Sequence, residues 1–250
     1  MNVAIVYFSG TGNTKAIAYG YKEALMKHGH DVDIRSIEKI YAIPEHDLLI
    51  IGGPIYAGNM PDELINWVRK NIKQVSDKKA IVFSTSAGLM NANGVKSIAK
   101  KLGNKGYDVI NVATYEMPRN FYIDKYDPTP EDVQKQQFEH EAHKIVDSLA
   151  SLNHQGKLNI DESVLLIDFY ADLFRIMAKF MGRSFSIDDS CIQCGLCEAN
   201  CPKKNIRYME KAYLDQCMMC TRCIHNCPVN AISYKGRKID AYRVHHEIVV

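Results

Sequence analysis

Hydrophobic and polar residues alternate along the first 150 residues in a pattern that predicts strands connected by amphipathic helices. Segments with the character of strands occur at residues 2–8, 31–37, 47–53, 79–86 and 107–117. Segments with helical periodicity lie between and after them, at residues 13–28, 61–72, 94–106 and 130–150. Three of the strands are hydrophobic throughout, as expected when helices cover both faces of a sheet. The pattern therefore predicts an α/β fold with a doubly wound parallel sheet and right-handed crossovers.

The pattern changes after residue 150. We predict a first domain at 1–150, a linker with an amphipathic helix at 151–186, a small domain at 187–235 and a tail at 236–250. In the linker, apolar residues recur at helical spacing, and charged residues lie on the other side of the helix. The apolar residues are Leu166, Tyr170, Leu173, Met177 and Phe180. We expect this helix to pack between the domains. The alternative is a docking helix for a partner or a membrane surface, although its mixed charges disfavour an anionic membrane.

The cysteines are the most informative part of the composition, because all eight lie between Cys191 and Cys227. The net charge of +2 is too small to indicate binding to nucleic acid or to an anionic membrane. No apolar run is long enough for a transmembrane helix, and the N-terminus lacks the basic region of a signal peptide. We therefore expect a cytoplasmic protein, in which clustered thiols indicate metal or redox chemistry rather than disulfides.

The cysteines form an internal repeat. Residues 191–202 read CIQCGLCEANCP, and residues 217–228 read CMMCTRCIHNCP. Each copy has the spacing C-x2-C-x2-C-x3-C-P, in which three closely spaced cysteines can bind one [4Fe–4S] cluster from a single loop. Zinc also binds four thiolates, but its sites usually pair two C-x2-C knuckles across a longer gap. The repeat thus favours iron–sulfur clusters over zinc.

The segment 187–235 resembles the bacterial two-cluster ferredoxins on this motif, in which the fourth cysteine binds the other cluster. The resemblance implies a small α+β domain with two [4Fe–4S] clusters. It implies that one cluster is held by Cys191, Cys194, Cys197 and Cys227. It implies that the other cluster is held by Cys217, Cys220, Cys223 and Cys201. Neither half of the repeat could then complete a cluster alone.

The loop after the first strand has the composition of a phosphate site. It reads YFSGTGNTKAIA at residues 7–18, where Gly10 and Gly12 permit a tight turn. Hydroxyl and amide groups come from Ser9, Thr11, Asn13 and Thr14. The following helix adds free N–H groups and a favourable dipole, with Lys15 expected to point outward. The loop lacks the glycine that a Walker motif needs at position 14 and the one that the dinucleotide fingerprint needs at position 15.

The run S-G-T-G-N-T resembles the FMN phosphate loop of flavodoxins, and the resemblance covers residues 1–150. It implies a five-stranded sheet of order 2-1-3-4-5, with FMN where the loops after strands one, three and four meet. Besides residues 9–14, the implied cofactor-binding residues are Pro54, Ile55, Tyr56, Ala57, Gly58, Ser86, Ala87 and Gly88. Tyr56 is the implied ring against the isoalloxazine. Met90, residues 117–122 or the ferredoxin domain would cover the other flavin face.

Together, the two resemblances indicate a similarity to flavodoxin–ferredoxin fusions of anaerobes. They imply an electron carrier that relays electrons between FMN, two [4Fe–4S] clusters and external redox proteins. The alternative is a flavin-dependent reductase of a small molecule or quinone, fed by the clusters, and a third class is a redox sensor that signals by docking. No acid–base pair or nucleophile stands out, so we assign no catalytic residue.

Overall fold

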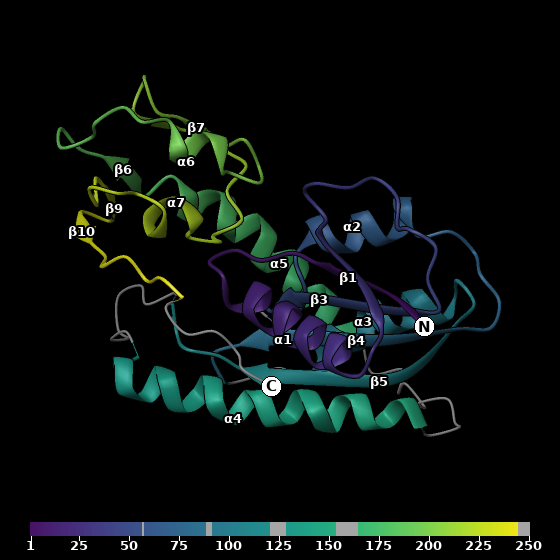
Figure 1. Ribbon diagram of the computed structural model, residues 1–250. Helices are drawn as coiled ribbons and strands as arrows, with labels where there is room; N and C mark the ends of the chain where they lie inside the picture. Colours follow the sequence, from purple (N-terminus) through teal and green to yellow (C-terminus); the bar gives the residue numbers. More distant parts are fainter. Residues whose placement is uncertain (57, 89–91, 121–128, 154–164, 245–250) are drawn as a thin grey trace.

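The computed structural model describes residues 1–56, 58–88, 92–120, 129–153 and 165–244. An α/β domain and a smaller cysteine-rich unit lie side by side, and one helix runs between them (Figure 1). The sheet of the first domain contains β1 (Asn2–Tyr7), β2 (Asp31–Ser36), β3 (Leu48–Pro54), β4 (Lys78–Ser86) and β5 (Tyr107–Glu116). These strands are parallel and have the order β2-β1-β3-β4-β5, which confirms the predicted flavodoxin-like fold.

Alternating side chains along each central strand build two hydrophobic cores. Val3 and Ile5 belong to the core that α1 (Asn13–Lys27) and α4 (Glu131–Ala150) cover. Ala4 and Val6 belong to the core on the other face, under α2 (Asp62–Asn71) and α3 (Ala92–Gly103). Because both faces of the strands are buried, they read as continuous apolar runs in the sequence. The sheet therefore leaves its carboxyl edge as the place where loops from several strands can meet.

Helix α5 (Leu165–Gly182) runs from the first domain to the cysteine-rich unit (Figure 1). It packs through Phe174, Ala178 and Met181, which contact the core of the cysteine-rich unit. The side chains expected to pack are instead 46% exposed at Leu173, 49% at Met177 and 60% at Phe180. The helix packs, but the prediction was wrong about which of its faces does so. Hydrophobic spacing alone does not say which side of a helix a neighbouring unit covers. The side chains of residues 165–171 lie outside those described.

The cysteine-rich unit is built from short elements around its own core. A three-stranded sheet of order β10-β9-β6 consists of β6 (Phe185–Ile187), β9 (Ile232–Tyr234) and β10 (Arg237–Lys238). Each cysteine repeat contains one short helix, α6 (Leu196–Ala199) or α7 (Arg222–His225), and β7 (Ile206–Arg207) pairs with β8 (Ala212–Tyr213). A 3-10 turn, η1 (Ser151–Asn153), follows α4. Among the described helices, none is both long and apolar enough to cross a membrane.

Candidate functional site

A cavity of about 360 Å³ lies at the carboxyl edge of the sheet, in the range of small-molecule sites. Its described walls come from four loops that follow β1, β3, β4 and β5, and from the cysteine-rich unit. Of the residues implied by the flavodoxin resemblance, the cavity brings together Ser9, Gly10, Thr11, Asn13, Thr14, Pro54, Ile55, Tyr56, Ser86 and Ala87. Gly12, Gly58 and Gly88 do not line it, and Ala57 and Met90 lie outside the described residues.

A second set of residues, outside the cofactor-binding residues implied by the sequence, lines the same wall. The residues are Thr85, Pro118, Arg119, Asn120, Phe174, Met219, Cys220 and Thr221. Residues 117–122 and the small domain are two of the three covers that the sequence suggested for one flavin face, so only Thr85 and Phe174 of this set are unexpected. A side chain of α5 and the middle of the second cysteine repeat both contribute to the wall, and no local signal in the sequence marks Phe174 for this position.

The loop after β1 forms a polar turn at the start of α1. The Ser9 hydroxyl accepts hydrogen bonds from the main-chain N–H groups of Gly12, at 3.2 Å, and Lys15, at 3.3 Å. Helix α1 has no acidic residue in its first turn, and its N-cap residue, Gly12, has no side chain, so no charge of its own first turn neutralises its positive end. Lys15 is exposed, as expected, and its ammonium lies 5.5 Å from the centre of the Tyr19 ring. The helix end thus remains suited to an anion.

The cavity wall contains polar side chains, one of which could bond to a ligand. The Thr14 and Thr85 hydroxyls are hydrogen-bonded at 2.7 Å, and the Asn120 amide donates to the Thr11 hydroxyl. The Ser86 hydroxyl is buried without a hydrogen-bond partner among the described residues. Because a buried polar atom without a partner is costly, a ligand that bonds to Ser86 would fit this wall.

Tyr56 lies between the polar loop and the second cysteine repeat. A Cβ atom added to Gly10 would come within 2.5 Å of the Tyr56 hydroxyl oxygen and 3.4 Å of the Cys220 carbonyl oxygen. Burial raises the pKa of Tyr56 well above its usual value, and the neighbouring Cys220 adds to that shift. The glycine at position 10 therefore allows the tyrosine and the cysteine loop to approach the polar turn closely.

The C-terminal segment, whose sequence carried no clear signal, also reaches the polar turn. The Tyr242 hydroxyl donates to the Asn13 side-chain oxygen at 2.6 Å, and the Asn13 amide donates to the Pro118 carbonyl at 3.0 Å. The Tyr242 main-chain N–H donates to His225 Nδ1 at 2.9 Å, while His225 Nε2 bonds to the Asn120 carbonyl at 2.7 Å. Since Nδ1 accepts, Nε2 carries the proton of a neutral ring, and burial lowers the pKa of His225 to about 4. This network ties the two domains together beside the cavity.

Three of the cysteines implied for the second cluster lie close enough to the fourth, Cys223, to affect its pKa. Burial raises the pKa of Cys223, and the neighbouring Cys220, Cys217 and Cys201 raise it further. Burial likewise raises the pKa of Cys220 to about 12, so on its own this thiol is uncharged at neutral pH. A thiolate at this position requires a compensating cation, which is what a bound metal centre supplies. The structure thus groups Cys201 with the repeat that follows it.

The first three cysteines form another group. Burial raises the pKa of Cys197, and Cys191 and Cys194 add to that shift. Cys227 Sγ accepts a 3.2 Å hydrogen bond from the Ala231 N–H, and the Ala231 carbonyl accepts one from the segment just before Cys191. All eight cysteines are free thiols, and six of them pack against the core of the small unit. In the part of the chain that the structure describes, no three His, Cys, Asp or Glu side chains converge tightly enough to bind a single metal ion.

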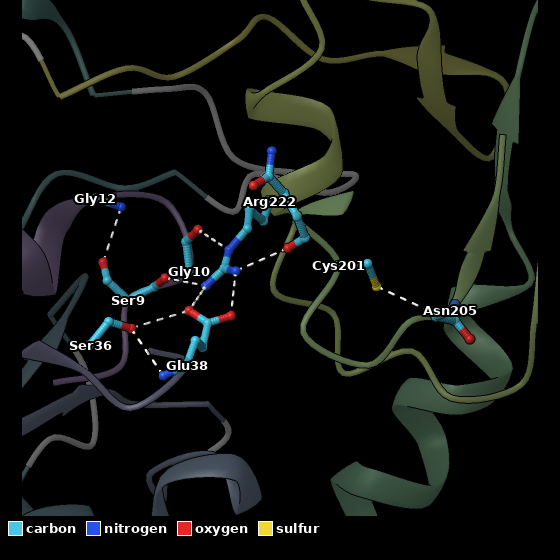
Figure 2. Close-up of polar contacts among 9 residues, drawn as sticks. Ser9, Gly10, Gly12, Ser36, Glu38, Cys201, Asn205 and Arg222 are labelled. Carbon is cyan, nitrogen blue, oxygen red and sulfur yellow. Dashed lines mark hydrogen bonds and ion pairs between the residues drawn. The ribbon is translucent and has the colours of Figure 1, made fainter. Parts of the chain in front are cut away.

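Arg222 connects the second cysteine repeat to the polar turn (Figure 2). Its guanidinium donates to the carbonyl oxygens of Gly10, at 3.0 Å, and Ser9, at 2.6 Å, and forms an ion pair with Glu38 at 2.7 Å. The Arg222 side chain is 11% exposed and its guanidinium lies 5.4 Å from the centre of the Phe8 ring. These contacts hold the small unit against the loop that starts α1.

A second cavity of about 410 Å³ adjoins the first. Tyr56 and Phe174 line both cavities, and Cys217 and Met218 line the second one from the cysteine-rich unit. Charged residues pair around it: Arg175 of α5 with Asp62 of α2 at 3.0 Å, and Lys203 of the cysteine-rich unit with Glu63 of α2. The second cavity therefore lies beside both the polar site and the second cysteine group.

Comparison with known proteins finds similarity in the first domain. Residues 4–117 match the family described as the flavodoxin domain, and no curated protein matches the chain. A Bacillus cereus flavodoxin 1 structure is 19% identical, with 62% of this chain and 100% of that chain covered and a TM-score of 0.45. A flavodoxin from the domain Archaea is also 19% identical, with 62% and 100% covered and a TM-score of 0.41. A putative quinone reductase from Klebsiella pneumoniae is 14% identical, with 63% and 86% covered and a TM-score of 0.43.

The flavodoxin-like fold of the first domain rests on its own strand order and on the match to residues 4–117. The matched segment runs from β1 to the end of β5, and it stops before the cysteine-rich unit.

Proposed function

We propose that this protein is an intracellular electron carrier that relays electrons between FMN, two [4Fe–4S] clusters and external redox proteins. One observation supports this proposal above all: Cys220 lies in the wall of the same cavity as the polar turn at residues 9–14. FMN accepts one or two electrons and each cluster accepts one, so together they exchange electron pairs for single electrons. The chain's own contribution is to hold these groups next to one another.

The residues of the cavity fit FMN. The start of α1 and the hydroxyls around it suit a phosphate, and the apolar side chains of Ile55, Phe174 and Met219 suit a flat aromatic ring. The unpartnered Ser86 hydroxyl offers a hydrogen bond to a polar ring edge. Met219, Cys220 and Thr221 of the ferredoxin-type unit would cover one side of a bound flavin, because the loop after β4 offers no aromatic residue.

The burial of the cysteines supports an order of electron flow. The four cysteines of the second group are half-buried, and Cys220 lines the cavity of the flavodoxin-like domain. In the first group Cys194 is exposed, and so is its neighbour Ile192, at 60%. With both clusters bound, the one held by Cys217, Cys220, Cys223 and Cys201 would lie next to the cavity and the other nearer to solvent. The proposed path between the flavin and a partner protein would therefore include the second cysteine group before the first.

The proposal is tested by anaerobic purification followed by redox titration with optical and EPR spectra. We expect one FMN and about eight irons per chain, as two cubane clusters require. Three separate redox centres should titrate. A colourless protein that carries zinc, or one that binds no flavin when FMN is added, would overturn the proposal.

The second cavity favours an alternative, a flavin-dependent reductase of a small molecule or quinone. Its position beside Cys217 and Tyr56 offers space for a small acceptor next to both proposed redox sites. The two functions differ in their need for a partner. Catalytic turnover of a quinone by the reduced protein, without any added protein acceptor, would favour the reductase, whereas electron exchange only with other redox proteins would favour the carrier.

A further inference from the structure

We infer that Arg222, in the iron–sulfur unit, is the positioning residue that makes the phosphate loop of the flavodoxin-like domain competent to bind FMN. The inference rests on the proposed function and goes beyond it, because it makes flavin binding in one domain depend on a residue of the other. Arg222 stands between Thr221, which lines the cavity, and Cys223, which belongs to the second cysteine group.

The guanidinium of Arg222 has a partner for each of its five N–H donors. Nε donates to the Gly10 carbonyl at 3.0 Å. Nη2 donates to the Ser9 carbonyl at 2.6 Å and to Glu38 at 3.0 Å, and Nη1 donates to Glu38 at 2.7 Å and to the Asn200 carbonyl at 2.9 Å (Figure 2). A fully used donor set on a mostly buried side chain fixes the atoms around it, because any displacement leaves a buried donor unpaired.

The two loop carbonyls determine where the loop N–H groups point. In a trans peptide the C=O and the N–H of the same plane point in opposite directions, and none of the described peptides is cis. When Arg222 holds the Ser9 and Gly10 carbonyls, the N–H groups of Gly10 and Thr11 therefore point away from Arg222. These are main-chain donors of the turn that precedes α1, where a phosphate would bind. Hydrogen bonding of the carbonyls to a cation also makes these N–H groups stronger donors.

Lysine cannot take over this role. Its ammonium has three donors and no planar fork, so it cannot bond to two successive carbonyls and a carboxylate in one plane. Glu38 neutralises the charge of Arg222, which leaves orientation of the loop as its main effect on an anion. The contribution of Arg222 should therefore be specific to ligands that carry the phosphate.

The test compares FMN with riboflavin, which has the same ring system and no phosphate. Dissociation constants for both are measured anaerobically by flavin fluorescence on cluster-loaded protein from which the flavin was removed. For Arg222→Lys we expect FMN binding at least about tenfold weaker, equivalent to ~1.4 kcal/mol. Riboflavin binding should stay within about twofold of the wild-type value. Arg183→Lys is the matched control, because Arg183 forms a similar two-pronged ion pair with Asp215 at 2.7 and 2.8 Å but does not line the cavity.

Unchanged FMN binding in Arg222→Lys would overturn the inference. An equal weakening of FMN and riboflavin binding would also overturn it, because Arg222 would then act only by holding the two domains together. If Arg222→Lys loses iron, Cys223→Ala serves as the reference, because it disturbs the same cluster while keeping Arg222. The inference is supported if FMN affinity falls more than riboflavin affinity in Arg222→Lys, while Cys223→Ala shows no such difference. It is overturned if FMN affinity relative to riboflavin affinity falls equally in both variants. Wild-type protein that binds neither flavin would refute the proposed function itself.

Discussion

The two cysteine repeats have the same local backbone in different surroundings. Left-handed conformations occur at Gln193, Gly195 and Lys204 in the first repeat and at Met219, Thr221 and Asn230 in the second. In each repeat the fourth cysteine accepts a 3.2 Å N–H···S hydrogen bond, from Asn205 to Cys201 and from Ala231 to Cys227. The spacing of the cysteines and the short helices between them thus produce the same fold twice.

The surroundings of the repeats differ because the second one lines the cavity of the flavodoxin-like domain, whereas the first reaches that domain beside the cavity's neighbour, through the ion pair of Lys203 with Glu63. Cys194 is exposed, whereas its counterpart Cys220 lines the cavity beside the polar turn. Gly195 corresponds to Thr221, a β-branched residue that is 4% exposed and adopts a conformation which favours glycine. Equivalent sequence positions can therefore serve different purposes, one directed at the flavin site and one at solvent.

The largest expected contrast is between Cys220→Ala and Cys194→Ala. Cys220→Ala should abolish electron transfer between the flavin and the iron–sulfur unit, because it removes the cluster next to the cavity. Cys194→Ala should preserve the flavin-to-cluster step and stop only the onward transfer to a partner. Rapid-mixing absorbance measurements on bound flavin and clusters would show this, with iron content as the control. Equal losses of the flavin-to-cluster step in both variants would contradict the proposed path.

The crossed ligand sets predict which variants share a defect. Cys201→Ala should behave like Cys220→Ala, and Cys227→Ala should behave like Cys194→Ala, although each pair mixes the two repeats. Each variant should keep about four irons if the other cluster survives. The measurement is iron content together with the flavin-to-cluster rate. A Cys201→Ala protein that keeps a wild-type flavin-to-cluster rate would show that ligands do not cross between the repeats.

The smallest effect concerns the left-handed position that the repeats share. Gly195→Ala should destabilise the small unit by about 1–2 kcal/mol, because a Cβ atom is unfavourable in that conformation. Thr221→Gly should relieve a similar strain but gain less, since it loses a 2.8 Å hydrogen bond from the threonine hydroxyl to the Cys220 carbonyl. Thermal midpoints measured anaerobically on the cluster-loaded variants would test the pair. If the thermal midpoint falls in both variants or in neither, conformational strain does not explain how Gly195→Ala and Thr221→Gly differ.

Several features of this protein could be predicted from local sequence alone. The five strands, the four helices of the first domain, the polar turn at residues 9–14 and the duplicated cysteine motif each depend on residues close together along the chain. Hydrophobic periodicity and motif spacing record such short-range constraints directly. The sheet order and the set of cofactor-binding residues were implied by the resemblance of the polar turn to flavodoxins; that order is observed, and ten of those residues line one cavity.

The contact between the two domains was decided only by the tertiary structure. Arg222 bonds to Gly10 across 212 residues, and Tyr242 bonds to Asn13 across 229. The hydrophobic pattern of α5 predicted a packing helix but not that Phe174 and Ala178, rather than Leu173 and Met177, would face the small unit. Such contacts depend on how two separately folded surfaces fit together, and no pattern within one segment records the shape of its distant partner. The sequence by itself therefore determined the parts of the site, and the docking of the domains determined that Cys220, Arg222 and Tyr242 complete it.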